Sequence, residues 1–170
     1  DTIDKPAYLI QDYVVETKAY QNWYLPNLIV HIPANSPNAT GEAVMVMAHF
    51  DSVPMGVGAS DDITACSVML EAARFYIESM ANGTEITNDL VFCFVNGEEF
   101  ALYGSEAFMK EFNGFNNIRD RIKFGINLEA RGTAGTQIMF ETAANNFNTI
   151  KMFAKVNRSL VTCSAATMIY

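Results

Sequence analysis

Three stretches of the chain are almost entirely apolar, which is the pattern of strands buried on both faces of a largely parallel sheet. They are Ala43–Ala48, Leu90–Val95 and Ile122–Leu128. Two earlier stretches, residues 8–18 and 24–32, are rich in β-forming residues and are typical of strands with one more exposed face. Pro26 indicates that the second of these lies near an edge of the sheet.

Between these stretches, apolar positions recur with helical spacing. Steps of four and three residues connect Cys66, Leu70, Ala73, Ile77 and Met80, and Gly83 follows as a typical helix end. A second helix is predicted over roughly residues 103–112 and a third from about 144 to 157. Strands that alternate with helices predict right-handed crossovers. The expected fold is an α/β three-layer sandwich, in which a mixed, mostly parallel sheet carries helices on both faces.

Composition and charge narrow the functional classes. Of the 170 residues, 50% are hydrophobic and 18% charged, as expected for one globular domain over residues 1–170. The 11 Lys and Arg residues against 19 Asp and Glu residues give a net charge of −8. Nucleic acids and anionic membranes need a basic patch, so neither is an expected partner. No apolar stretch approaches the ~18 residues that span a bilayer, so no membrane insertion is expected of this segment.

Chemically active side chains follow the buried strands, and the carboxyl ends of parallel strands meet at one edge of a sheet. The groups expected at this edge are His49-Phe50-Asp51-Ser52, Ser60-Asp61-Asp62, Gly97-Glu98-Glu99 and Glu129. Each also has a plainer role. Ser60, Asp61 or Asp62 could cap a helix, and Glu98 and Glu99 could be first-turn acids of the next helix. His49 could be a surface histidine, and Glu129 could form an ion pair with Arg131. Carboxylates crowded together repel one another unless cations neutralise them, so the joint pattern favours a metal site.

The ligand types indicate which metal and which chemistry to expect. One imidazole with carboxylates and no thiolate suits zinc, or manganese or cobalt in its place, better than copper or calcium. Asp51 is expected to accept the second ring N–H of His49. Of the adjacent Glu98 and Glu99, one can bind the metal while the other takes a proton from water. This arrangement predicts a hydrolase.

Four linked motifs over about residues 24–140 closely resemble the co-catalytic zinc aminopeptidases, a family that includes bacterial leucyl aminopeptidases, glutamate carboxypeptidase and glutaminyl cyclase. The motifs are His49-Phe50-Asp51-Ser52, Gly58-Ala59-Ser60-Asp61-Asp62, Gly97-Glu98-Glu99 with Tyr103-Gly104-Ser105, and Asn127-Leu128-Glu129. The residues of these motifs are most similar to those of the membrane-tethered branch, whose peptidase domain faces a vacuolar, endoplasmic-reticulum or outer cell-surface space. The resemblance therefore implies an extracytoplasmic domain and a membrane-tethered parent protein.

The resemblance also implies a role for each matching residue. Asp61 would bridge two zinc ions, and the Asp61–Asp62 peptide bond would be cis. His49 and Glu129 would complete one zinc site, and Glu99 would serve the other. Glu98 would be the general base and would later protonate the leaving amine, with Asp51 as its catalytic partner beside His49.

Two departures from the family pattern limit this expectation. Most of its aminopeptidases carry Asp where this chain has Glu129, which puts metal spacing and substrate preference in doubt. The family's remaining zinc ligand is a histidine far beyond the third motif, whereas this chain ends at Tyr170, and His31 is expected to be structural. We therefore expect a domain truncated on its C-terminal side, with one zinc ion or none and no activity of its own. An uncovered sheet edge would invite self-association.

For the intact enzyme, the sequence predicts a zinc-dependent exopeptidase, and more narrowly an aminopeptidase that removes amino-terminal residues from peptides. Two alternatives stay open. One is a glutaminyl-peptide cyclase, which shares the fold and most ligands but catalyses an intramolecular acyl transfer. The other is an inactive peptidase-like binding module, against which the retained Glu98 argues.

Overall fold

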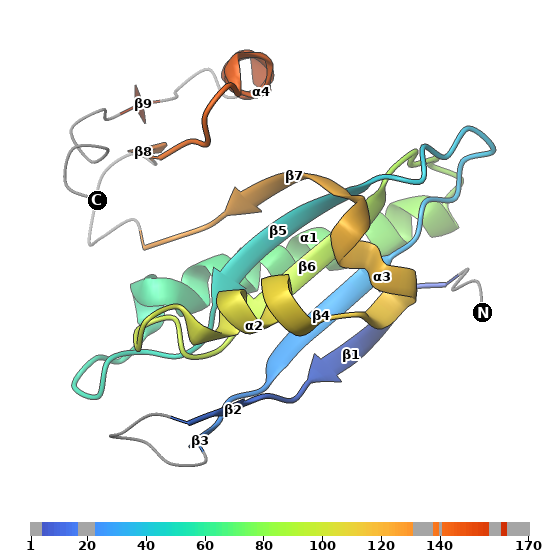
Figure 1. Cartoon of the computed structure of the whole chain (residues 1–170). Coiled ribbons are helices and arrows are strands. Elements are labelled where there is room, and N and C mark those ends of the chain that lie inside the picture. Colours follow the sequence, from blue (N-terminus) through green and yellow to red (C-terminus); the bar gives the residue numbers. More distant parts are fainter. Residues whose placement is uncertain (1–4, 17–22, 131–137, 140, 157–160, 163–170) are drawn as a thin grey trace. The chain divides into compact units, whose positions relative to one another are not determined.

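The computed structural model describes residues 5–16, 23–130, 138–139, 141–156 and 161–162. The chain divides into two compact units, residues 1–130 and 131–170, and each is described by itself. The first unit contains a five-stranded sheet with helices on both faces (Figure 1). This is the mixed α/β arrangement that the sequence predicts.

The sheet has the strand order β1-β4-β6-β5-β7. Its strands are β1 (Ala7–Gln11), β4 (Asn27–Ile32), β6 (Asp89–Val95), β5 (Ala43–His49) and β7 (Ile122–Asn127). β5 runs parallel to both of its neighbours, β6 and β7, whereas β4 is antiparallel to β6 and β1 is antiparallel to β4. The parallel part therefore brings the carboxyl ends of three strands to one edge.

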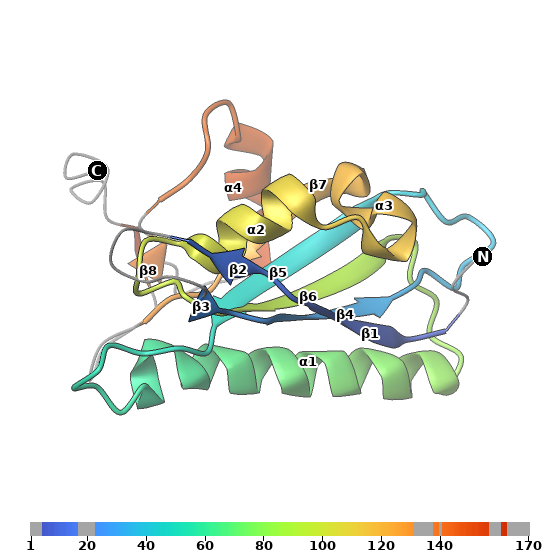
Figure 2. The same cartoon turned by 60° about the horizontal axis from the view of Figure 1, so that its bottom comes forward.

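Two crossovers place a parallel strand on each side of β5. The chain first crosses to β6 through α1 (Thr64–Ala81), and it then reaches β7, on the other side of β5, through α2 (Tyr103–Glu111) and α3 (Gly114–Arg121). Figure 2 shows α1 on one face of the sheet and α2 and α3 on the opposite face. Such a reversal of strand order opens a crevice at the carboxyl end of the central strand. In this sheet, the general rule points to the end of β5 as the place for a functional site.

The two faces of the sheet have separate apolar cores. On one face, Cys66, Met69 and Ala73 of α1 pack with strand residues that include Phe92 and Phe94. On the other face, four residues of α2, α3 and the turn between them pack with strand residues that include Ile29 and Cys93; these four are Phe108, Phe112, Phe115 and Ile118. β6 lies between both cores, and five consecutive residues, Val91–Val95, are buried.

Two details of the predicted burial are wrong. The third apolar stretch forms β7, whose residues alternate between partly buried and exposed because only β5 pairs with it in the described sheet. In α1, Leu70 and Ile77 are 56% and 39% exposed. The buried side of the helix is centred nearer Met69 and Ala73, and Leu70 is turned about 100° from its neighbour Met69. Steps of three and four residues fit more than one side of this helix, because it has more apolar residues than its buried side holds.

Shorter elements also differ from the predicted ones. The stretch 8–18 yields β1 and then β2 (Val14–Val15), which pairs in antiparallel fashion with β3 (Trp23–Tyr24). The predicted helix 103–112 corresponds to α2, and α3 follows it as a helix that the sequence pattern did not reveal. In α3, Phe115, Asn116 and Asn117 have positive φ angles, which apolar spacing cannot predict.

The second unit contains three described elements. β8 (Ile138–Met139) pairs with β9 (Val161–Thr162) in parallel, and α4 (Phe147–Val156) lies within the helix predicted over 144–157. Among the described residues of the chain, no helix has both the length and the apolar character needed to cross a membrane.

Candidate metal centre

The predicted site residues lie where the parallel strands end. His49 is the last residue of β5, and Glu98 and Glu99 lie in the segment that follows β6. Glu129 comes two residues after β7, and Asp61 belongs to the turn Ala59–Ile63 that precedes α1. Three separate connections thus bring acidic side chains to one histidine.

The imidazole of His49 is the centre of this group. Its Nε2 atom lies 3.0 Å from Asp61 Oδ1, 3.6 Å from Glu129 Oε1 and 3.9 Å from Glu98 Oε2. One ligand atom from each of His49, Asp61 and Glu129 falls within 4.8 Å of the others, a spacing that can hold a metal ion. The structure therefore brings together three of the four residues predicted to bind metal.

The carboxylates around His49 favour the binding of a cation. Burial alone lowers the pKa of His49, but the nearby carboxylates of Asp51, Glu129 and Glu98 raise it to about 11. Among the described residues, the ion pairs of these carboxylates are with His49 and not with Lys or Arg. A proton on His49 thus supplies positive charge that a metal ion at the same place would supply instead.

Asp62 is a member of the site whose role the sequence did not indicate. Its side chain is 1% exposed, and neither carboxyl oxygen has a hydrogen-bond partner among the described residues. Burial raises its pKa to about 7, with smaller contributions from neighbouring carboxylates. His49 Nε2 is also buried without a hydrogen bond in the described part of the chain. Unsatisfied buried polar atoms beside several carboxylates fit a bound cation.

The plainer explanation of Asp61 and Asp62 as helix caps is wrong. The residue before the first turn of α1 is Ile63, and no side chain caps this helix end. Asp61 and Asp62 have non-helical backbone angles, and the peptide bond between them is cis, as the resemblance implied. The two carboxylates therefore precede the helix and are not part of its first turn.

Asp51 contacts His49 in a different way from the one expected. His49 Nδ1 lies 3.1 Å from the main-chain carbonyl oxygen of Asp51, and the nearer carboxylate oxygen is 3.6 Å away. The carboxylate instead accepts the backbone N–H groups of Glu98, at 3.1 Å, and Glu99, at 3.2 Å. Burial alone would raise the pKa of Asp51, but His49 and these N–H groups hold it below its ordinary value. Asp51 therefore fastens the segment after β6 to the end of β5.

The two adjacent glutamates have different surroundings. Burial and the neighbouring carboxylates raise the pKa of Glu98, which suits a group that must take and return a proton. Glu99 lies outside the three-residue group, and its Oε1 accepts the N–H of Val53 at 3.3 Å. Glu129 accepts the N–H of Ala130 at 2.9 Å, and its interaction with His49 lowers its pKa. Arg131, the other predicted partner of Glu129, lies outside the described residues.

Comparison with known proteins identifies relatives of the chain. The model of peptidase family M28 matches residues 27–168. The candidate endoplasmic reticulum metallopeptidase 1 of Schizosaccharomyces pombe is 35% identical over 144 residues, which are 85% of this chain and 16% of the relative. The vacuolar membrane protease of Candida dubliniensis is 34% identical over 130 residues, which are 76% of this chain and 13% of the relative. The chain thus spans about one sixth or less of these curated relatives.

Solved structures support the fold. The aminopeptidase from Aneurinibacillus sp. strain AM-1 has a TM-score of 0.59 and 25% identity, and the match covers 68% of this chain and 27% of that one. An Acidobacteriales bacterium glutaminyl cyclase has a TM-score of 0.70 at 15% identity, covering 92% of this chain and 57% of that one. The resemblance to an α/β metallopeptidase with membrane-associated relatives is confirmed. The chain belongs to peptidase family M28.

Proposed function

We propose that this chain forms part of the catalytic domain of a zinc-dependent exopeptidase, most specifically an aminopeptidase. The observation that carries the proposal is the Glu98 carboxylate, 3.9 Å from His49 Nε2, beside a group that can hold a metal ion. In this proposal His49, Asp61 and Glu129 would hold zinc, and Glu99 would contribute to a second zinc site together with Asp61. Asp62 adds a buried carboxylate beside them.

The residues divide the chemistry among themselves. Zinc, when bound, polarises the peptide carbonyl and makes water a better nucleophile near neutral pH. Glu98 takes a proton from the attacking water and later donates it to the leaving amine. Asp51 holds the backbone of the segment that carries Glu98. The surrounding carboxylates attract the α-ammonium group of the substrate, which favours peptides with a free amino terminus.

The relatives favour hydrolysis over cyclisation. Those at 34% and 35% identity are named as a protease and a metallopeptidase. The glutaminyl cyclase at 15% identity shares the fold, which by itself does not indicate its reaction. The relatives' names also support a domain that faces an organelle lumen or another extracytoplasmic space, in a protein that is tethered to a membrane.

The test measures how the natural protein, loaded with zinc, acts on each of three substrates. We expect release of a chromogenic amine from an aminoacyl substrate, no release from its N-acetylated form, and no cyclisation of an amino-terminal glutamine. Turnover in the cyclisation assay alone would contradict the peptidase proposal. Zinc binding without turnover, with no change on Glu98→Gln substitution, would favour the inactive binding module.

A second measurement tests the proposed division of the site. The 170-residue chain by itself should bind one zinc ion at most and should not hydrolyse the aminoacyl substrate. Metal analysis after dialysis measures the stoichiometry. Two zinc ions per chain together with activity would show that these residues already contain a complete site.

A further inference from the structure

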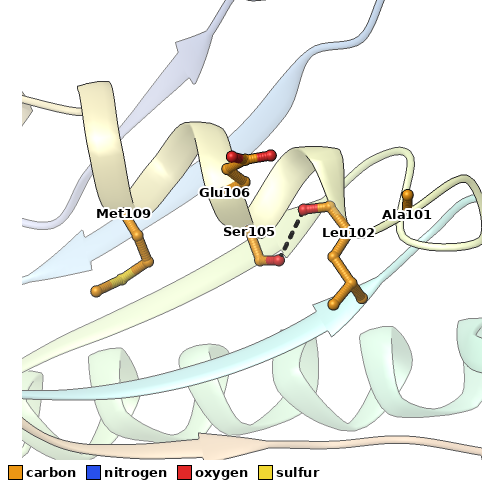
Figure 3. A pocket seen from close by; sticks show the side chains of 5 residues that line it. All are labelled: Ala101, Leu102, Ser105, Glu106 and Met109. Carbon is orange, nitrogen blue, oxygen red and sulfur yellow. Dashed lines mark hydrogen bonds between the residues drawn. The ribbon is translucent and has the colours of Figure 1, made fainter.

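The segment Asn96–Leu102 carries both Glu98 and Glu99, and its backbone departs from regular structure. Gly97 has φ +77°, and the non-glycine residues Ala101 and Leu102 have φ +92° and +60°. Figure 3 shows Leu102 at the start of α2, where the Ser105 hydroxyl donates to the Leu102 carbonyl at 3.0 Å. Non-glycine residues keep positive φ angles only where the surroundings enforce them. Contacts beyond Asp51 must therefore hold this segment.

One such contact is the side-chain amide of Asn27, at the start of β4. It is 0% exposed, and its Oδ1 accepts the N–H of Asn96 at 3.0 Å. Its Nδ2 donates to the carbonyl of Gly104 at 2.8 Å and to Gln11 Oε1 at 3.0 Å. The backbone is packed closely here, since a Cβ added to Gly104 would lie 2.4 Å from the Asn96 carbonyl oxygen. Asn27 thus ties the last residue before Gly97 to the first turn of α2.

Tyr13, between β1 and β2, contacts the other backbone polar group of Asn96, its carbonyl oxygen. Its hydroxyl donates to the Asn96 carbonyl oxygen at 2.5 Å, and its ring is buried. Burial, with a smaller contribution from the charge of Asp51, raises the pKa of Tyr13 far above its ordinary value. The hydroxyl therefore stays protonated near neutral pH and remains a donor there.

Apolar packing from the same part of the chain reinforces these bonds. Leu25 donates its N–H to the Tyr13 carbonyl at 3.1 Å, and its Cδ1 would lie 2.8 Å from a Cβ added to Gly97. The ring of Trp23 meets that of Phe100, the residue after Glu99, edge to face with centroids 4.6 Å apart. Tyr13, Leu25 and Ala107 of α2 belong to one buried cluster.

We propose that Tyr13 is a positioning residue which, together with Asn27, holds the segment carrying Glu98 and Glu99 beside the candidate metal centre. This inference rests on the proposed peptidase function, because it assigns a role in that reaction. Asp51 holds the segment at the N–H groups of Glu98 and Glu99, whereas Tyr13 and Asn27 hold it at Asn96. Two independent anchors fix where the Glu98 carboxylate lies relative to His49.

The test compares two Tyr→Phe substitutions in the natural protein. Tyr13→Phe removes the hydroxyl that contacts Asn96, and Tyr24→Phe removes an exposed hydroxyl that donates to Asp12. Small displacements of a reacting group are costly, so Tyr13→Phe should lower kcat by about 10-fold or more while KM and bound zinc stay unchanged. Tyr24→Phe should leave all three unchanged. Amide hydrogen exchange at Glu98 and Glu99 should lose protection in Tyr13→Phe alone.

A purely structural role would lower thermal stability and leave kcat intact below the unfolding temperature, and that result would overturn the proposal. If the unsubstituted protein does not hydrolyse peptides, the proposed function fails, and unchanged exchange at Glu98 and Glu99 in Tyr13→Phe would then sink the positioning role as well. Should Tyr13→Phe not fold, Trp23→Leu removes the ring contact with Phe100. It should lower kcat at constant zinc content, and an unchanged kcat would count against the proposal.

Discussion

His31 and His49 are both buried beside carboxylates, yet they lie at opposite ends of the sheet and in opposite charge environments. His31 is 3% exposed and His49 is 2% exposed. His31 Nε2 lies 2.9 Å from Asp89 Oδ2, and the same oxygen accepts a hydrogen bond from Arg121 Nη1 at 2.8 Å. The Ala34 N–H donates to the other oxygen of Asp89 at 2.8 Å. One carboxylate is thus balanced by one guanidinium, and no further cation is needed.

The pKa values of the two histidines move in opposite directions for this reason. Burial lowers the pKa of His31, and the carboxylate of Asp89 does not overcome it while Arg121 is nearby. At His49, several carboxylates without a described Lys or Arg partner raise the pKa to about 11. Burial next to a carboxylate therefore does not mark a functional histidine. Within the described residues, the carboxylates around His49 lack a Lys or Arg partner, and this distinguishes the candidate metal centre from the network around His31.

The largest expected effect is at the end of the sheet that carries His49. Replacing Glu98 with Gln keeps its shape but removes its ability to take a proton. The turnover number of the natural protein should fall by about 10²- to 10⁴-fold, as for other general bases, while bound zinc is retained. Steady-state kinetics and metal analysis measure the two quantities. Glu106→Gln is the matched control, because Glu106 is exposed and pairs with Lys110 on α2. Full activity in Glu98→Gln would remove Glu98 from the mechanism.

Making the same substitution at each of the two histidines tests the comparison directly. His49→Asn should weaken zinc binding by at least about 100-fold, since even residues that only support a ligand cost 10- to 100-fold. His31→Asn should leave zinc affinity unchanged, because Arg121 already neutralises Asp89. Competition with a chromogenic chelator measures both affinities. Equal losses in the two variants would mean that zinc binding reports general stability and not the His49 site.

The sequence predicted the part of the site that depends on strand ends. His49, Asp61 and Glu129 meet because parallel strands finish at one edge, and this follows from apolar stretches and the residues after them. The sequence did not reveal that the Asp51 carboxylate binds the N–H groups of Glu98 and Glu99. Strand patterns place a residue at an edge, but they do not say which backbone groups a side chain can reach.

Contacts between distant segments were also beyond sequence reasoning. Tyr13 and Asn96 are 83 residues apart, and Asn27 and Asn96 are 69 apart. These bonds depend on how Tyr13 and Asn27 pack near the start of α2. The burial of Asp62 follows from the backbone of the turn before α1, where helix-cap patterns gave the wrong expectation. Patterns along the chain fix elements, whereas such bonds form only after the elements pack.

At the other end of the sheet, the largest effect should be on stability. Asp89→Asn removes the charge that balances Arg121 and weakens three hydrogen bonds to this carboxylate. The Arg121 side chain of this pair is 32% exposed, so the loss should cost about 1–3 kcal/mol of the free energy of unfolding. Urea denaturation measures this change, and zinc affinity should be unaffected. In the control, Glu71→Gln breaks an exposed pair with Arg74 and should cost about 1 kcal/mol or less. A similarly small loss in Asp89→Asn would contradict a structural role for this network.

The smallest expected effect is a pH dependence that belongs to His31. Its pKa is lowered in the folded state, so below the ordinary value of 6.5 the unfolded chain binds a proton that the folded chain resists. The stability contributed by neutral His31 is therefore present above pH 6.5 and is lost as the pH falls through that value. The charged groups that face its ring are Asp89 and Arg121. Asp89 has a pKa below its ordinary value, so it stays ionised in this range.

The difference in unfolding free energy between the wild type and His31→Gln isolates this contribution. Asp62 and Glu98 also have raised pKa values, but their contributions are the same in both proteins and cancel in the difference. The advantage of the wild type should shrink as the pH is lowered from 7 to 5, by about 1.4 kcal/mol for each unit that separates the folded and unfolded pKa values. A difference that stays constant over this range would show that His31 keeps an ordinary pKa. The attraction of Asp89 would then fully offset burial and Arg121, and the contrast with His49 would no longer include a lowered pKa at His31.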